Sequence, residues 1–327
     1  MLLPVLLTLV ASPAALLGWQ LRQTAIIDIP GQPGFEQAVF ANGMLVLAHQ
    51  SSDRLDIFNP ALRRVVAQVP GMSSPHGLAV DASRGHVYVA NSRGNNVAVV
   101  SSKDWKLERT FPVERAPYSL ALSPDGRTLL IGNWQDQSVT ALDPASGKAV
   151  TANLGGSPQE LVFGDGGRVV YVTLQDTAEV VAIDPATLKV LRRTKLSGSQ
   201  PTGLVLDSSG QRLYVAVREA VIQLDASSGA ELGRAAAPKG ADSLWLDSAN
   251  GLLYLASSGG YVSIFSVQGG LAPVAEVHTE VRGHSLAYDP ARKLVFLPGG
   301  HEGRSKLLIL KQILEQPAQR AQQVAIK

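Results

Sequence analysis

A repeat of about 42 residues runs along most of the chain and constrains the fold more than any other feature. Each copy holds short β-rich runs separated by polar turns, as in "PHGLAVDASRGHVYVANSRGNNVAVV" from Pro75 to Val100. The copies begin at Gly34, Pro75, Pro117, Pro158, Pro201, Ala241 and Gly283, so their spacings are 41, 42, 41, 43, 40 and 42 residues. Short strands at this spacing are typical of antiparallel meanders, and four strands per unit are typical of a propeller blade. The sequence therefore predicts an all-β fold, a seven-bladed β-propeller with four-stranded antiparallel blades.

The seventh copy is shorter than the others, and the start of the chain supplies what it lacks. The copy holds three strands and ends near Lys311, whereas "QTAIIDIPGQPG" at Gln23–Gly34 resembles the fourth strand and loop "RRVVAQVPGMSS" at Arg63–Ser74. We expect the N-terminal strand to close the ring as the outer strand of blade seven, with Gln23–Pro30 paired to Lys306–Lys311. Closure of this kind removes the open edges of the first and last blades.

The two ends of the chain differ from the repeat. Residues 1–18 read as a signal peptide with an apolar core at Leu2–Val10, although no basic residue precedes that core. We expect a propeller over residues 19–312 and a polar tail over 313–327. The apolar run is shorter than the roughly 20 residues that span a bilayer, so no membrane span is predicted. These features predict a periplasmic or extracellular protein.

Composition narrows the classes of partner and cofactor. The chain of 327 residues has no cysteine, which excludes disulfides, a catalytic thiol and thiolate metal sites. Its formal net charge is +2, and no block of Lys and Arg stands out, so we expect no nucleic-acid partner. We expect a monomer that binds a small molecule or a protein.

Several strand motifs resemble a known repeat family. "YVAN" at Tyr88–Asn91, "YVTL" at Tyr171–Leu174, "YVAV" at Tyr214–Val217 and "SPDGRTLL" at Ser123–Leu130 look like the YVTN family of β-propeller repeats. The resemblance covers roughly Gln23–Lys311 and implies a seven-bladed propeller. It implies little about function, because the matched residues build strands and turns. "SPHGL" at Ser74–Leu78 is faintly similar to the Pro-His segments of seven-bladed propeller lactonases.

The start of each blade supplies the candidate site. The first strand of a propeller blade lines the central channel, so residues at the start of each copy are expected to meet at one mouth of that channel. Convergent polar groups in a concavity are the usual starting point for a site hypothesis. The ligand-binding candidates are Glu36, His76, Tyr118, Gln159, Glu160, Asp242 and His284.

Two further sets of candidates come from residue chemistry. Imidazoles with carboxylates suit Zn²⁺ or a similar divalent ion, so His76, His284 and Asp242 are a candidate metal set for one divalent metal ion. In the loops expected on the same face, Trp134 is either a packing plug between blades or an exposed contact. Arg218 and Arg304 are candidates to hold a carboxylate.

These observations leave two functions open. One is a binding scaffold that recognises a ligand or a protein through its channel face. The alternative is a metal-dependent lactonase-like hydrolase or lyase with its site at the channel mouth, for which polar groups at the mouth would act as acid, base or metal ligands. A haem or quinone redox role ranks low, because the chain has no Cys-x-x-Cys-His motif. A channel-mouth His76 is expected to be replaceable by Ala with little loss of stability.

Overall fold

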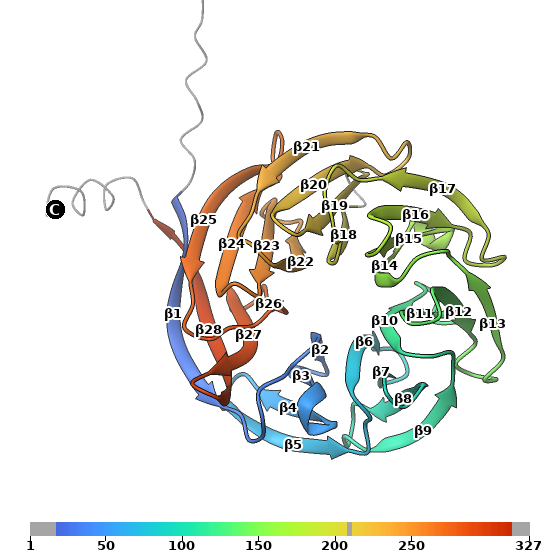
Figure 1. The fold of residues 1–327 in the computed structure, drawn as a ribbon. Helices are drawn as coiled ribbons and strands as arrows, with labels where there is room; N and C mark the ends of the chain where they lie inside the picture. Colours follow the sequence, from blue (N-terminus) through green and yellow to red (C-terminus); the bar gives the residue numbers. More distant parts are fainter. Residues whose placement is uncertain (1–17, 208–210, 316–327) are drawn as a thin grey trace, which may run out of the picture.

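The chain forms a ring of seven antiparallel sheets around a central channel (Figure 1). This computed structural model describes residues 18–207 and 211–315. In every sheet one strand lies at the channel and the fourth lies at the rim. The predicted seven-bladed propeller is confirmed. Its other regular elements are the 3-10 helices η1 (Gln50–Ser52) and η2 (Asp165–Gly167).

Blades one to seven follow the order of the chain. Blades one to three contain β2 (Ala38–Ala41), β3 (Met44–His49), β4 (Arg54–Asn59), β5 (Arg64–Pro70); β6 (Pro75–Asp81), β7 (His86–Asn91), β8 (Asn96–Ser101), β9 (Leu107–Pro112); and β10 (Pro117–Leu122), β11 (Leu129–Asn133), β12 (Ser138–Leu142), β13 (Ala149–Asn153). Blades four and five contain β14 (Pro158–Gly164), β15 (Val169–Leu174), β16 (Glu179–Ile183), β17 (Val190–Lys195); and β18 (Leu204–Asp207), β19 (Arg212–Val217), β20 (Ala220–Asp225), β21 (Glu231–Ala236). Blades six and seven contain β22 (Ala241–Asp247), β23 (Leu252–Ser257), β24 (Tyr261–Ser266), β25 (Ala272–His278); and β26 (Ala287–Asp289), β27 (Leu294–His301), β28 (Arg304–Glu315), β1 (Gly18–Asp28).

The hydrophobic core is divided among the contacts between neighbouring blades. The middle strands are buried on both faces, so they read as continuous apolar runs such as "HVYVAN" in β7, whereas the rim strand β9 is largely exposed. Between blades one and two, for example, Val46 and Ile57 pack with Val87 and Val100, and all four are fully buried. Each such side chain contributes about 1.5–3 kcal/mol when it leaves water. Stability is therefore spread around the ring and depends on its closure.

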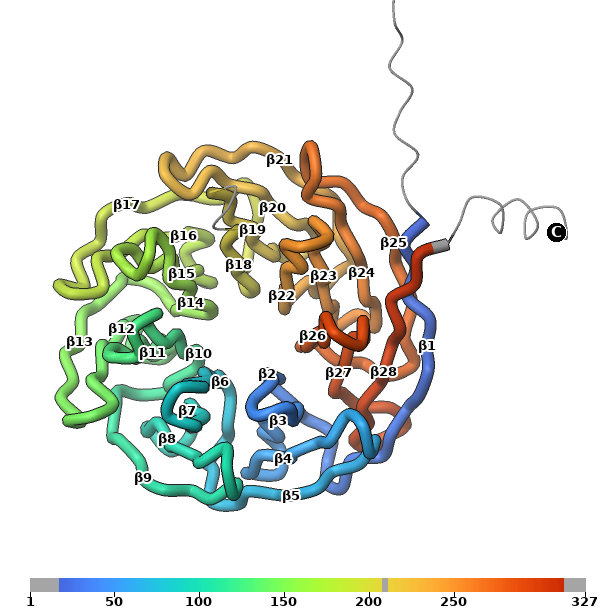
Figure 2. Tube along the Cα trace, turned by 180° about the vertical axis from the view of Figure 1, so that it is seen from behind, coloured from blue at the N-terminus to red at the C-terminus, as the bar shows by residue number. Residues whose placement is uncertain are grey.

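The N-terminal strand closes the ring, as the sequence predicts. Strand β1 pairs antiparallel with β28, with Gln23 opposite Leu310 and Asp28 opposite Lys306, and β1 follows the rim beside β28 (Figure 2). The sheet is longer than expected, because the pairing continues to Gly18 opposite Glu315. Strand β1 thus begins at Gly18, and the last strand continues to Glu315. The rest of the expected signal peptide (1–17) and of the tail (316–327) lies outside the described residues.

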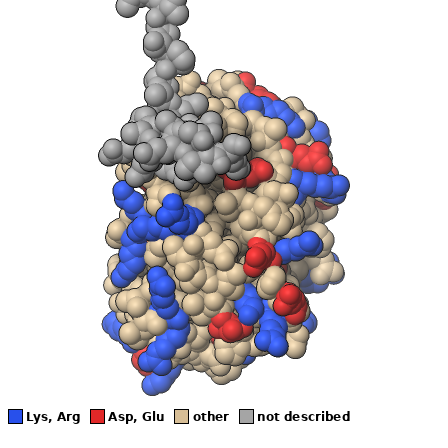
Figure 3. Space-filling view, turned by 90° about the vertical axis from the view of Figure 1, so that its left-hand side faces the viewer, with Lys and Arg blue, Asp and Glu red and all other residues tan. Residues whose placement is uncertain are grey.

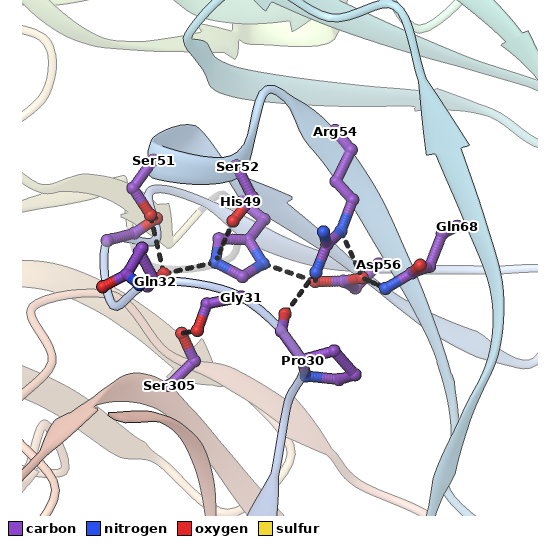
Figure 4. Close-up of polar contacts among 11 residues, drawn as sticks. Pro30, Gly31, Gln32, His49, Ser51, Ser52, Arg54, Asp56, Gln68 and Ser305 are labelled. Atoms are coloured by element: carbon purple, nitrogen blue, oxygen red, sulfur yellow. Dashed lines mark hydrogen bonds and ion pairs between the residues drawn. The ribbon is translucent and has the colours of Figure 1, made fainter. Parts of the chain in front are cut away.

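A buried polar cluster holds the loop that joins β1 to blade one (Figure 4). His49 is fully buried, with Nδ1 2.5 Å from Oδ2 of Asp56 and Nε2 2.6 Å from the Gln32 carbonyl oxygen. Both oxygens are hydrogen-bond acceptors, so each ring nitrogen of His49 faces an acceptor. Arg54 donates to the Pro30 carbonyl and, at 2.9 Å, to Oδ1 of Asp56. The His49 ring and the Arg54 guanidinium, both anchored by one carboxylate, thus bind the backbone of the closing loop.

Glycine is needed at one point of this loop. Gly31 has a φ of +112°, which L side chains rarely adopt. A Cβ there would lie 2.5 Å from Ser52 Oγ and 3.0 Å from the His49 ring. The loop therefore approaches the cluster closely because it has no side chain at this position.

The rim carries charges of both signs. Figure 3 shows Lys and Arg side chains together with Asp and Glu side chains over the side that faces the viewer, with uncharged surface between them. Among residues 18–207 and 211–315, no helix has the length and apolar character needed to cross a bilayer.

Candidate functional site

The starts of the blades meet around one small polar cavity at the channel mouth. Its volume is about 50 Å³, enough for a few water molecules. All seven ligand-binding candidates line it, namely Glu36, His76, Tyr118, Gln159, Glu160, Asp242 and His284. The structure brings these residues together, and their role in binding stays a prediction.

Small residues let neighbouring blades approach closely beside these side chains. The N–H of Gly203 donates to the Asp242 carbonyl at 3.1 Å, and the N–H of Ser243 donates to the His284 carbonyl at 3.2 Å. A Cβ on Gly203 would lie only 2.2 Å from the same Asp242 oxygen. Glycine is required at this position because the backbone of the next blade occupies the space of a side chain. The close approach fixes where the polar side chains of adjacent blades point.

Glu36 lies between two histidines on neighbouring blades. Its carboxylate oxygens are 3.7 Å from His76 Nε2 and 3.9 Å from His284 Nε2. His76 Nδ1 lies 2.9 Å from the Ser74 carbonyl, which accepts, so Nδ1 carries the proton. Burial raises the pKa of Glu36 although the two imidazoles oppose that change. The three side chains form one electrostatically coupled group.

His284 also pairs with Asp242, and this pair reaches the outer edge of the mouth. Nδ1 of His284 lies 3.2 Å from Oδ2 of Asp242, and each side chain is about a third exposed. Burial lowers the pKa of His284, but the hydrogen bond to Asp242 and the charges of Asp242 and Glu36 outweigh that effect and raise it to about 9. The pair is therefore an imidazolium and a carboxylate at neutral pH, with no net charge.

A hydrogen bond crosses the channel below these groups. Nε2 of Gln37 in blade one donates to Oε2 of Glu160 in blade four at 2.9 Å, and Oε1 of Gln37 accepts the N–H of Leu78 at 2.8 Å. Removal from water raises the pKa of Glu160 to about 8, although its hydrogen bonds with Leu161 and Gln37 lower it. The bridge spans the channel, and burial leaves Glu160 mainly protonated at pH 7.

Sequence reasoning missed Gln37, although the repeat contains a signal for it. The other six blades have leucine at the same position, and Gln37 alone departs from the pattern. The leucines are Leu78, Leu120, Leu161, Leu204, Leu244 and Leu286. A polar side chain in an otherwise apolar repeat position indicates a specific partner, which here is Glu160.

We expect Glu160→Gln to change how stability depends on pH. A carboxyl group with a raised pKa in the folded state stabilises the fold below its unfolded pKa and loses that contribution as pH rises through the folded value. The stability of the parent relative to Glu160→Gln should therefore fall by at least about 1 kcal/mol between pH 4.5 and pH 8. Denaturant unfolding at several pH values measures this difference. The exposed Glu219→Gln is the matched control, and a stability difference between parent and Glu160→Gln that does not change with pH would contradict the expectation.

The structure does not assemble the expected metal set of His76, His284 and Asp242. Nowhere in residues 18–207 and 211–315 do three or more His, Cys, Asp or Glu side chains have the placement needed to hold a metal ion. His284 Nδ1 faces Asp242, and the Nε2 atoms of both histidines face Glu36. Each histidine thus pairs with a carboxylate, and Glu36 of blade one lies between the two.

The expectation that His76 contributes little packing is wrong. His76 is only 7% exposed. Its ring lies 4.7 Å from the Tyr118 ring, measured between centroids, and its Nε2 is 3.4 Å from the Gln50 amide. The first strand starts inside the ring of blades and not at its surface, so His76 is enclosed by its neighbours. Burial also raises the pKa of Tyr118.

The three loop candidates lie apart from one another. Trp134 is 40% exposed, so it is not a plug between blades. Arg304 begins β28 in blade seven and lines neither the mouth cavity nor the groove beside it. Arg218 is exposed and lines that groove, which has a volume of about 440 Å³. Thr202 and Asp242 line both the groove and the mouth cavity, so the two lie next to each other.

Comparisons with known proteins agree with the architecture. A solved structure of hydrazine synthase from Kuenenia stuttgartiensis superposes with a TM-score of 0.76 at 17% identity, covering 88% of this chain and 97% of the other, which shows a shared fold. YncE from Escherichia coli strain K12 is 29% identical over 110 residues, and the O157:H7 protein is 28% identical. Each match covers 30% of this chain and 31% of the relative's length.

The family comparison covers more of the chain. The YNCE-like beta-propeller family matches residues 37–244, from the first strand of blade one to the first strand of blade six. The matched part holds the repeats that resemble the YVTN type, and the rest of the ring continues the same blade pattern. The chain therefore belongs to the YNCE-like beta-propeller family.

Proposed function

We propose that this protein is a binding scaffold that takes a small polar ligand at the mouth face of its propeller. One observation carries the proposal: a groove of about 440 Å³ lies beside the polar mouth cavity, and Thr202 and Asp242 line both. This volume lies within the range of about 300–1,000 Å³ that is typical of small-molecule sites. The groove gives a ligand room, and the mouth offers Asp242 and His284 as polar contacts.

The same dimensions favour binding over lactone hydrolysis or a lyase reaction. The cavity among Glu36, His76 and Glu160 has only about 50 Å³, which is too small for a lactone ring. A substrate in the groove would meet Asp242 and Thr202 but not the deeper carboxyl groups. In our proposal, Glu36, His76 and Glu160 therefore shape the channel mouth. We also propose that the protein works as a monomer in the periplasm or outside the cell, as its signal-like start suggests.

Blocking the groove tests this function. Ser258 lies in an exposed turn that lines the groove, and its N–H donates to the Gly240 carbonyl at 2.9 Å. We expect Ser258→Trp to fill the groove and weaken binding of compounds found in a ligand-observed NMR screen by at least about tenfold, with unchanged unfolding. Ser92, whose N–H donates to the Ser74 carbonyl at 3.0 Å, occupies the same place in blade two, so Ser92→Trp is the matched control. Hits that bind Ser258→Trp as well as the parent would overturn the proposal, and so would a screen without hits.

A further inference from the structure

The groove beside the mouth owes its shape to a short turn in blade five. In blades one to four, the turn between the second and third strands spans residues 50–53, 92–95, 134–137 and 175–178, whereas in blade five it consists of Arg218 and Glu219 alone. The longer turns carry a side chain that caps the loop leading into a blade. These side chains are Asp53, Asn95, Asp136 and Asp176, which accept backbone N–H groups of Ser74, Ala116, Arg115 and Ser157. The short turn has no such side chain, and the space that a longer turn would fill stays open.

The short turn also leaves two cations in the groove without an acidic partner. Arg93 and Arg115 on the same face are each paired with an aspartate, at 2.6 Å to Asp53 and 2.5 Å to Asp136. Arg218 instead donates to the side-chain oxygen of Gln200 at 2.5 Å, and no carboxylate in the described part of the chain pairs with it or with Lys239. A backbone hydrogen bond connects the two segments that carry these cations: the N–H of Gly240, the residue after Lys239, donates to the Arg218 carbonyl at 2.9 Å.

The walls of the groove show which anion would suit it. Phosphate sites commonly use free backbone N–H groups, but the N–H of Gly240 is bonded to Arg218 and that of Gly259 to Ser257 Oγ at 3.2 Å. The planar guanidinium of Arg218 matches a carboxylate with two parallel hydrogen bonds. Asp242 at the inner end is already paired with His284, so its charge does not oppose an anion at the outer end.

We propose that the groove between blades five and six binds a small molecule through its carboxylate, which Arg218 and Lys239 hold while the rest of the ligand extends toward Asp242. This inference rests on the proposed binding function and names the class of its ligand. Gln175 and Gln200, which line the same groove, supply amide groups to the polar body of the ligand. The selectivity of the site comes from one guanidinium and one ammonium in a groove without an acidic partner for either.

Charge-neutral ligands and charge-removing variants test the inference. Calorimetric titration of the full chain uses succinate, citrate, the neutral analogue succinamide and inorganic phosphate as probes. We expect succinate or citrate to bind and the double variant Arg218→Gln/Lys239→Gln to weaken that binding by at least about tenfold. Succinamide should bind at least tenfold more weakly than succinate. The control Arg64→Gln/Lys103→Gln removes the same charge from exposed positions outside the groove and should bind like the parent.

The outcomes separate this inference from the function it rests on. Equal binding of succinate and succinamide, no effect of the double variant, absence of carboxylate binding, or phosphate binding tenfold tighter than either carboxylate would each overturn the carboxylate site. If hits of the NMR screen still bind and Ser258→Trp still blocks them, only the ligand class is wrong. If nothing in the screen binds the parent, the binding function itself fails.

Discussion

Asp56→Ala is expected to lower the free energy of unfolding by about 3–5 kcal/mol, because it leaves the buried His49 and the guanidinium of Arg54 without their carboxylate partner. Asp56 is fully buried and joins His49, Arg54 and the amide of Gln68, which donates to Oδ1 at 2.8 Å. Without the carboxylate, the His49 ring and the Arg54 guanidinium lose the anchor that holds them against the closing loop. Unfolding in guanidinium chloride measures the loss, provided that the unfolding free energy of both proteins depends equally steeply on denaturant concentration.

The exposed pair of Asp104 and Lys106 provides the control. Its charged atoms are 3.1 Å apart, but both side chains are at least half exposed. Asp104→Ala should therefore change stability far less than Asp56→Ala. Similar losses for the two variants would show that the Asp56 cluster is not a buried clamp.

The effect of Asp56→Ala should also depend on pH. Burial raises the pKa of Asp56, but the hydrogen bonds from His49, Arg54 and Gln68 and the charge interaction with His49 outweigh it, so the pKa is lowered. A carboxyl group with a lowered pKa stabilises the fold above its unfolded pKa of about 4 and loses this contribution as pH falls through the folded value. The gap between parent and Asp56→Ala should be widest near neutral pH and shrink in acid.

Removing the closing strand, Gly18–Asp28, should have the other large effect. Without β1, the edge of β28 loses its hydrogen-bonding partner, and Leu21 and Ile26 no longer cover the cores next to blade seven. We expect a loss of at least about 5 kcal/mol, comparable to the total stability of many domains, and association through the open edge. Light scattering after size exclusion and thermal melting by circular dichroism measure both effects.

A peptide supplied in trans is the control for this truncation. A synthetic peptide of residues 18–30 should restore the monomer and raise the melting temperature, because it can pair with β28 in the native register. A scrambled peptide of the same composition should do neither. A truncated chain that stays monomeric and melts like the parent would show that the ring does not depend on this closure.

The candidate site was predictable in its members but not in its geometry. The repeat aligned the seven blade starts, so Glu36, Glu160 and His284 were assigned to one mouth, and they do line one cavity. Their contacts depend on rotamers and on the close approach of blades at Gly203, and a repeat pattern does not contain that information. The pattern therefore suggested a metal set where the structure shows histidine–carboxylate pairs.

The sequence by itself determined the number of blades, their strand order and the register of ring closure. These features follow from local signals, namely short β-rich runs, turn residues and a repeat in which one missing strand has one matching segment. Only the tertiary structure decided the bridge from Gln37 to Glu160, the clamp of His49 and Asp56, and the open groove at Arg218. Each of these depends on distances between segments far apart in sequence or on space left by a short turn. Local patterns do not encode such distances, because packing around the whole ring sets them.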